Sequence, residues 1–182
     1  FVLAAMALAN AKAAAAEAGV GLAKWLQLVG VLHCLHEYGV DFSTTIGRSM
    51  EPTCRAAGDL LVVDRFTHRF WGVNRGQVVI AISKQNADNR VCKRVIGLAG
   101  DQVVIPAEHS MSRNEEVFEV PRGHVWLEGD NKPASQDSRA YGPVPMPLLV
   151  GIVRYKLWPP GLLGPVAQVS VTDRIFLDDS TF

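Results

Sequence analysis

From Gly58 onward the sequence consists of short runs rich in valine and isoleucine. Glycine, aspartate, asparagine and proline separate these runs, and no long helical period interrupts them. Short β-branched runs with turn residues between them are typical of strands joined by tight turns. We therefore predict a mostly β domain, a barrel or a folded sheet, over residues 41–160. The runs are GDLLVVDRF, GQVVIAIS, RVCKRVIGL, DQVVIP, EEVFEVP, GHVWLEG and LLVGIVRYKLW.

The two ends of the chain lack this strand pattern. Residues 1–19 are rich in alanine, the best helix former, and we predict a helical or frayed, mobile leader there. A targeting segment is the alternative, without the arginine and serine enrichment of a transit peptide. Residues 161–182 show no sustained period, which predicts a loose tail.

Residues 20–40 form a predicted N-terminal helix whose environment has two interpretations. Between Lys24 and Glu37 no residue carries a formal charge, which favours a membrane anchor. That run is about 12 residues long, whereas a bilayer span needs roughly 20. Lys24 and Trp25 could lie at the interface and lengthen the effective span. An amphipathic or packing helix is the other interpretation.

Charge and cysteine content exclude several classes of function. Eighteen basic residues balance eighteen acidic ones, which argues against a nucleic-acid partner bound by bulk electrostatics. The three cysteines are too few for a disulfide scaffold, and no C-x-x-C pair indicates a zinc site. Cys54 lies close to Ser49 in the sequence and Cys92 adjoins Lys93, but no histidine is placed to activate either thiol. We therefore expect both thiols to serve in packing.

The first segment suited to chemistry is the turn around Ser49. Pro52 biases Glu51 away from the α region, so the turn is extended and can present a side chain. Ser49 is therefore a candidate nucleophile. The competing interpretation is that Ser49 caps or solvates the backbone, as most turn serines do.

The second segment contains Lys93 within a predicted strand. Strand alternation places Val91, Lys93 and Val95 on one face, so the lysine is expected to be desolvated. Burial disfavours the ammonium form and lowers a lysine pKa, and a neutral amine can accept a proton from a serine hydroxyl. The alternative is a lysine on an edge strand that reaches water.

The third segment, residues 129–142, is dense in turn residues. Asp137 and Arg139 have the reach and charge to pair and brace a site. Ser135 is placed to donate a hydrogen bond that orients a neutral lysine, which is the kind of support that such a base needs. A polar loop without a site is the simpler alternative.

Taken together, these segments resemble the type I signal peptidase family, and within it the mitochondrial members. Each motif is weak alone, but four of them in the family's order make a specific signal. The matching stretches are SMEPT (residues 49–53), GDLLVV (58–63), KRVIGLAGD (93–101) and GDN with SQDSRAYG (129–131 and 135–142).

The resemblance implies a membrane-anchored serine endopeptidase that needs no metal or cofactor. It implies that Ser49 is the nucleophile and that Lys93 is the general base. It also implies that Ser135 orients Lys93, while Asp137 and Arg139 form a structural salt bridge behind the site.

The resemblance to mitochondrial members also implies a location and partners. The location is the mitochondrial inner membrane, with the catalytic domain facing the intermembrane space. The substrates would be precursor polypeptides that carry sorting peptides, and a related second peptidase subunit would complete a complex.

One position departs from the pattern of some relatives. They carry a serine two residues before the nucleophile, where its hydroxyl helps to stabilise the oxyanion, whereas this chain has Gly47. The oxyanion would then depend on backbone amides, with that of Ser49 as the first candidate.

Three other functions compete with this one. A self-cleaving repressor has a similar serine turn, but the N-terminal residues here are not basic and the motif over residues 129–142 would be unexplained. A chloroplast- or bacterial-type signal peptidase and a non-catalytic subunit of a processing complex are nearer alternatives. For substrate binding, residues 80–82 and 103–105 either line a groove that accepts the peptide as an added strand or belong to the core.

Overall fold

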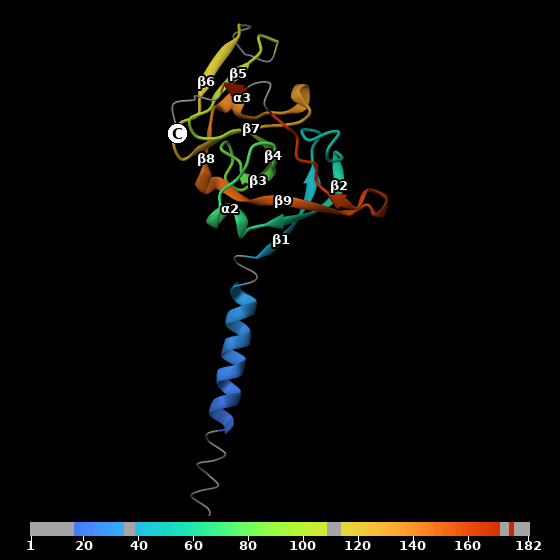
Figure 1. Ribbon diagram of the computed structural model, residues 1–182. Helices are drawn as coiled ribbons and strands as arrows, with labels where there is room; N and C mark the ends of the chain where they lie inside the picture. Colours follow the sequence, from blue (N-terminus) through green and yellow to red (C-terminus); the bar gives the residue numbers. More distant parts are fainter. Residues whose placement is uncertain (1–16, 35–38, 109–113, 172–174, 177–182) are drawn as a thin grey trace, which may run out of the picture. The chain divides into compact units, whose positions relative to one another are not determined.

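The computed structural model describes residues 17–34, 39–108, 114–171 and 175–176 (Figure 1). It divides into two compact units, Phe1–Gly39 and Val40–Phe182. Most of the alanine-rich leader and the last six residues of the tail lie outside the described residues.

In the first unit, residues 17–34 form a helix with mostly exposed side chains. The segment contains four leucines, which are strong helix formers. We expected a helix over residues 20–40, but the second unit already begins its first strand at Val40. Within the described residues, no helix has both the length and the apolar character that a bilayer crossing requires.

The second unit is built almost entirely of strands. Its short helices, of three or four residues each, fall within the connections between them. The elements are β1 (Val40–Ile46), β2 (Ala57–Asp64), α2 (Thr67–Phe70), β3 (Val78–Ile82), β4 (Arg90–Gly97), β5 (Gln102–Ile105), β6 (Glu116–Glu119), β7 (His124–Glu128), η1 (Lys132–Ala134), α3 (Ser138–Tyr141), β8 (Val144–Pro145), η2 (Met146–Leu148), β9 (Leu149–Trp158), η3 (Pro160–Leu162), β10 (Gly164–Pro165) and β11 (Ile175–Phe176).

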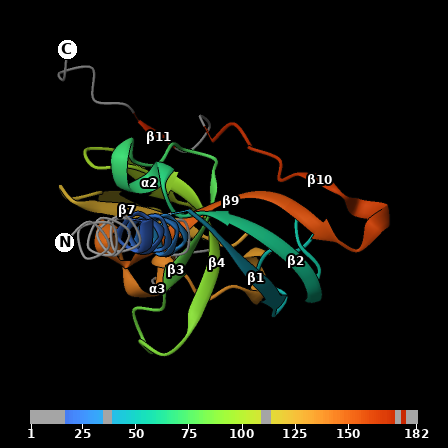
Figure 2. The same cartoon turned by 90° about the horizontal axis from the view of Figure 1, so that it is seen from below.

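The strands form one large and one small antiparallel sheet. The large sheet has the order β1-β2-β9-β3-β4-β7-β8, and β10 pairs with β9. The long strand β9 thus lies between β2 and β3. Figure 2 shows β9 running beside β2. The small sheet has the order β11-β5-β6. Among the described strands β1 does not pair with β8, so the predicted mostly β folded sheet is confirmed and it is not a closed barrel.

The core lies on both faces of the large sheet. Alternate residues of β3 point to opposite faces, so Val79 packs into one apolar cluster while Val78 and Ile80 pack into the other. The residues of β3 and those in the first half of β9 are mostly buried, so these two paired strands form the buried centre of the large sheet. A third cluster around Trp126 joins the small sheet to β7.

The described part of the tail is less loose than the sequence predicted. β10 pairs with β9, and the Val166 amide donates a hydrogen bond to the Arg154 carbonyl oxygen. The Val166 and Val171 side chains pack against two of the apolar clusters. Strand pairing and core contacts therefore order a segment that has no periodicity of its own.

Candidate active site

Ser49 lies in the loop that joins β1 to β2. A hydrogen bond from the Gly47 amide to the Ala56 carbonyl oxygen, of 2.6 Å, closes this loop. Gly47 has φ of +104°, a conformation that residues with a Cβ rarely adopt. The Asn131 amide donates to the Ser49 carbonyl oxygen over 3.0 Å. The nucleophile candidate is therefore tied to the segment that follows β7.

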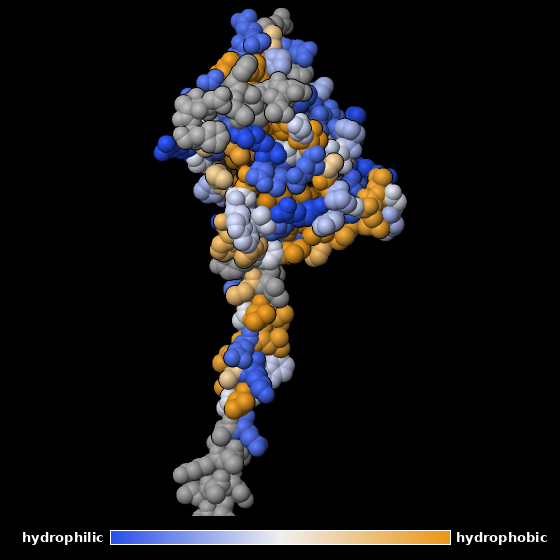
Figure 3. Space-filling model, viewed as in Figure 1, coloured by the Kyte–Doolittle hydropathy of each residue, from blue (hydrophilic) through white to orange (hydrophobic). Residues whose placement is uncertain are grey.

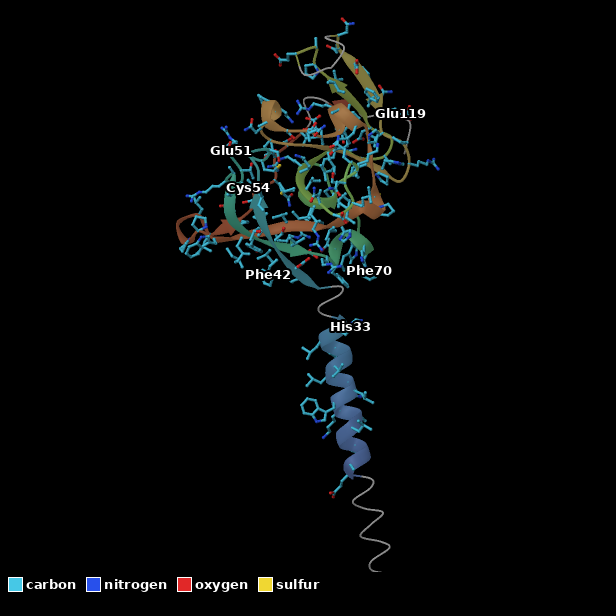
Figure 4. The ribbon with its side chains drawn as sticks, turned by 180° about the vertical axis from the view of Figure 1, so that it is seen from behind. His33, Phe42, Glu51, Cys54, Phe70 and Glu119 are labelled. Carbon is cyan, nitrogen blue, oxygen red and sulfur yellow. The ribbon has the colours of Figure 1, made fainter. Side chains whose placement is uncertain are left out.

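The same loop is anchored in the core behind Ser49. The side chains of Met50 and Cys54 are buried in the apolar cluster that includes Ile80. The Cys54 amide donates to the Met50 carbonyl oxygen over 2.8 Å, which forms one turn of the chain. Figure 4 shows Glu51 and Cys54 close together on this loop. A loop fixed at both its ends and its middle can hold a side chain in one place.

Lys93 lies in β4, between β3 and β7 in the large sheet. It is opposite Val79 of β3, and its side chain is only 4% exposed. Its neighbours Val91 and Val95 belong to the apolar cluster on one face of the sheet. The alternative of an edge-strand lysine that reaches water is therefore wrong. Burial holds the pKa of Lys93 below its ordinary value of 10.5, and the nearby Asp137 carboxylate only partly offsets this.

Ser49 and Lys93 both line a cavity of about 190 Å³. In the described part of the chain the Lys93 amine is hydrogen-bonded to Ser135 and not to Ser49. Catalytic hydrogen bonds are often long in a free enzyme and shorten in its complex with substrate. The cavity walls come from β1, the Ser49 loop, β2, β3 and β4.

A chain of hydrogen bonds connects Lys93 to the segment after β7. The Lys93 amine donates to the Ser135 hydroxyl oxygen over 3.0 Å, and the Ser135 hydroxyl donates to Asp137 Oδ2 over 2.6 Å. We expected Ser135 to donate to the lysine, but the hydrogen bond runs from the lysine to Ser135. A hydroxyl can donate only one hydrogen bond, and Ser135 donates it to the Asp137 carboxylate.

Asp137 is the fully buried centre of this segment. Its carboxylate accepts hydrogen bonds from the Arg139 guanidinium at 2.8 and 2.9 Å and from the Gly129 amide at 2.9 Å. Burial alone would raise the pKa of Asp137, but the hydrogen bonds from Arg139, Gly129 and Ser135 outweigh burial and lower it. Asp137 also caps the N-terminus of α3 by accepting from the Arg139 amide. The salt bridge expected between Asp137 and Arg139 is thus present in the structure.

Gly129 allows three parts of the site to approach one another. A Cβ at this position would lie under 3.0 Å from the Ser135 side chain and from the Ser49 carbonyl oxygen. The two segments that carry Ser49 and Ser135 therefore meet over a residue without a side chain.

A second ion pair, between Arg94 and Asp130, lies beside the site and was not predicted from the sequence. The Arg94 guanidinium, almost fully buried, donates to both oxygens of Asp130 at 2.8 and 2.7 Å. Thr53 donates to Asp130 and accepts from Arg94, so this network links the Ser49 loop to β4 and to the segment after β7. The signal was available, because strand alternation buries an arginine next to Lys93 and a buried arginine requires a carboxylate partner.

The expected groove residues separate into two places. Ile80 lines the cavity with Ser49 and Lys93, whereas Val103 and Ile105 are buried in the cluster around Trp126. Of the residues that the structure describes, no three histidine, cysteine, aspartate or glutamate side chains gather as metal ligands would.

Comparisons with known proteins identify the family. The model of the family described as "Signal peptidase, peptidase S26" matches residues 22–117 and 106–158. The chain is 39% identical to mitochondrial inner membrane protease subunit 1 of Homo sapiens over 145 residues, which cover 76% of this chain and 86% of that protein. It is 37% identical to mitochondrial ATP-independent inner membrane protease subunit 1a of Arabidopsis thaliana, covering 79% of this chain and 83% of the relative.

Two further comparisons are more distant. The chain is 36% identical to mitochondrial inner membrane protease subunit 2 of Mus musculus, over 63% of this chain and 65% of that protein. The crystal structure of a signal peptidase I from Enterococcus faecalis V583 aligns with a TM-score of 0.36 at 28% identity, covering 44% of this chain and 95% of that one. The family match spans most of the chain, so the resemblance read from the motifs is confirmed: the chain belongs to the signal peptidase family, peptidase S26.

Proposed function

We propose that this protein is a membrane-associated serine endopeptidase that removes sorting peptides from precursors directed to the mitochondrial intermembrane space. Ser49 is the nucleophile and Lys93 is the general base. The observation that carries the proposal is a buried lysine amine with a lowered pKa on the wall of the cavity that also contains Ser49. A neutral amine in that place can activate a serine hydroxyl without a histidine.

The hydrogen bonds of Ser135 leave Lys93 equipped for this role. The Ser135 hydroxyl donates its hydrogen bond to Asp137 and therefore accepts a hydrogen bond from one N–H of Lys93. A neutral amine has two N–H bonds and one lone pair, so the lone pair remains available to take the Ser49 proton. Ser135 and Asp137 are positioning residues in this scheme, and Arg139 holds Asp137 in place.

The reaction then follows the acyl-enzyme route. The Ser49 hydroxyl oxygen attacks the carbonyl carbon of the scissile peptide while Lys93 takes its proton. Collapse of the tetrahedral intermediate breaks the C–N bond, and Lys93 returns the proton to the leaving amine. A water molecule, deprotonated by the same amine, attacks the ester and frees Ser49.

The oxyanion of the intermediate requires a hydrogen-bond donor near Ser49. Among the described residues, no acceptor takes the Ser49 amide hydrogen, so it is available for this purpose. One such donor contributes about 3–4 kcal/mol to lowering the barrier. The left-handed conformation of Gly47 sets the direction in which the following backbone enters the loop.

The second unit exposes apolar side chains of the kind that contact a membrane surface. Large apolar side chains are exposed at the end of α2, where Phe70 is 61% exposed and the next residue, Trp71, is 73% exposed. Phe42 of β1 and Trp158 at the end of β9 are exposed as well. Apolar residues also gather near α2 and along the ends of β2 and β9 in Figure 3. Aromatic side chains of this kind favour the membrane interface.

The names of the relatives support a proposal for location and partners. Several are named mitochondrial inner membrane proteases, and both a subunit 1 and a subunit 2 are among them. We propose that this chain resides in that membrane with its second unit facing the intermembrane space, and that it assembles with a related second subunit.

The test is cleavage of a purified intermembrane-space precursor, with the new N-terminus identified by mass spectrometry. The wild-type chain, alone or with a subunit 2 relative, should release one defined N-terminus. Ser49→Ala should release none, while Ser83→Ala, which changes a turn serine outside the cavity, should cleave normally. Cleavage by Ser49→Ala, or none by wild type together with its partner, would exclude the proposal in favour of a non-catalytic subunit.

A further inference from the structure

Two thiols that the proposed mechanism does not use lie in the wall of the active-site cavity. Cys54 of the Ser49 loop and Cys92 of β4 both line the cavity. Both also contact the same apolar cluster, in which Cys54 is 1% exposed and Cys92 is only partly buried. Both are free cysteines in the structure.

The two thiols lie close to each other, since both line this cavity and both pack in this cluster. Each thiol affects the ionisation of the other: their interaction lowers the pKa of Cys54 and, together with burial, raises the pKa of Cys92. The nearby Lys156 also favours the Cys54 thiolate. Cys54 is thus the thiol that carries negative charge more readily.

We infer that Cys54 and Cys92 form a redox-active pair that closes to a disulfide when a small disulfide oxidant enters the cavity. A disulfide requires two cysteines whose side chains already face each other. Cys54 and Cys92 pack in the same apolar cluster and line the same cavity, which is the arrangement that this requirement calls for. The inference does not depend on the proposed peptidase activity, since it concerns the state of the thiols.

The chemistry is thiol–disulfide exchange in two steps. The Cys54 thiolate attacks one sulfur of the external disulfide and expels one thiolate, which leaves a mixed disulfide. The Cys92 thiolate then attacks Cys54 Sγ and expels the second thiolate. The two cysteine sulfurs are oxidised, the external disulfide is reduced, and the two cysteine protons pass through solvent to the two released thiols.

The bond would join the two segments that carry the proposed catalytic pair. Cys54 follows Ser49 in the loop, and Cys92 directly precedes Lys93 in β4. An oxidised chain therefore has the Ser49 loop covalently attached to the lysine strand. The modification acts on the cavity that would hold the substrate.

The test uses the full-length chain and glutathione disulfide as the oxidant. After exposure, free thiols are alkylated, the protein is digested without reductant, and the peptides are identified by mass spectrometry. We expect a peptide pair linked through Cys54 and Cys92 that disappears after reduction. Exposed Cys34, in the first unit, should carry glutathione instead and reports that the oxidant was active.

Two variants decide whether the pair is specific. Cys34→Ser should form the same linked peptides in the same yield, whereas Cys92→Ser should form none. The inference is overturned if Cys54 and Cys92 are both alkylated while Cys34 carries glutathione. It is overturned equally if each cavity thiol carries glutathione and no linked peptide forms.

Discussion

The Lys93 amine lies 3.0 Å from the Ser135 hydroxyl oxygen, and it is the lysine that donates. The Asp137 carboxylate determines this direction, because it accepts the one hydrogen bond that the Ser135 hydroxyl can donate. An acceptor fixes one N–H bond of the lysine and thereby the direction of its lone pair. The carboxylate also favours the charged form of Lys93, whereas burial opposes it and has the larger effect on the pKa. Ser135 thus holds the proposed base in place, and Asp137, whose negative charge is paired with Arg139, holds Ser135.

Replacement of Lys93 should separate activity from stability. Lys93→Met and Lys93→Arg should each lower kcat by about 10²–10⁴-fold, because neither side chain can act as a base at neutral pH. Because burial penalises the lysine charge, Lys93→Met should have a melting temperature equal to or higher than that of wild type. Precursor cleavage and thermal unfolding measure the two effects. Near-normal turnover by Lys93→Met would contradict the assignment of the base.

The pH profile of cleavage should report the lysine. Burial lowers the pKa of Lys93 below 10.5, so kcat/KM should rise with pH through that lowered pKa and level off before 10.5. Between the lowered pKa and 10.5 the unfolded chain binds more protons than the folded one, so the free energy of unfolding should also rise with pH. Lys93→Met should lack this rise in stability. A rate that is flat where the lysine titrates would argue against the mechanism.

Gly129→Ala should disrupt the site through steric contact. Its Cβ would lie under 3.0 Å from the Ser135 side chain and from the Ser49 carbonyl oxygen, so one of the two segments must move. A misplacement of about 1 Å can lower a catalytic rate by 10²-fold. We therefore expect a loss of kcat of about that size, measured by precursor cleavage. Gly161→Ala is the matched control, since no atom lies within 4 Å of its Cβ position, and equal loss in both variants would refute this explanation.

A glycine is required at position 47 because of its backbone conformation and not because a side chain would collide with neighbouring atoms. Its φ is +104°, yet no atom lies within 4 Å of the Cβ position. Gly47→Ala and Gly47→Ser should therefore be destabilised alike, by about 1–3 kcal/mol in urea unfolding. Although some relatives carry a serine here, Gly47→Ser should not exceed wild-type activity. A faster Gly47→Ser enzyme would mean that the loop accepts a side-chain oxyanion donor.

The sequence predicted the features that depend on local residue patterns. It did not predict the contacts that depend on how distant segments fold together. The alternation of β4 predicted a lysine between Val91 and Val95 on one face, and both valines join the apolar core. The direction of the Lys93–Ser135 hydrogen bond could not be read, since it depends on where Asp137 lies in space. The Arg94–Asp130 pair requires that the segment after β7 fold back over β4.

The ends of the chain show the same division. The tail has no periodic pattern of apolar residues, yet its strand β10 pairs with β9. The residues of the tail alone do not indicate this pairing. The helix over residues 17–34 overlaps the segment 20–40 in which the uncharged run predicted a helix, and β1 begins at Val40.

Asp137→Asn should destabilise the protein strongly and change its response to acid. Arg139 is 9% exposed and would be left without a carboxylate, which costs about 3–5 kcal/mol for a buried pair. Asp41→Asn breaks the exposed pair with Arg90 and should cost only about 0–1 kcal/mol in the same urea unfolding experiment.

The acid response has a definite sign. The pKa of Asp137 is lowered below 3.8 in the folded state, so its stabilisation is complete above 3.8 and is lost as pH falls through the lowered pKa. Asp137→Asn should therefore unfold with a shallower dependence on pH below 3.8 than wild type does. If the two proteins lost stability in parallel over that range, the carboxylate that supports Ser135 and Lys93 would not be the ionised group that the hydrogen bonds require.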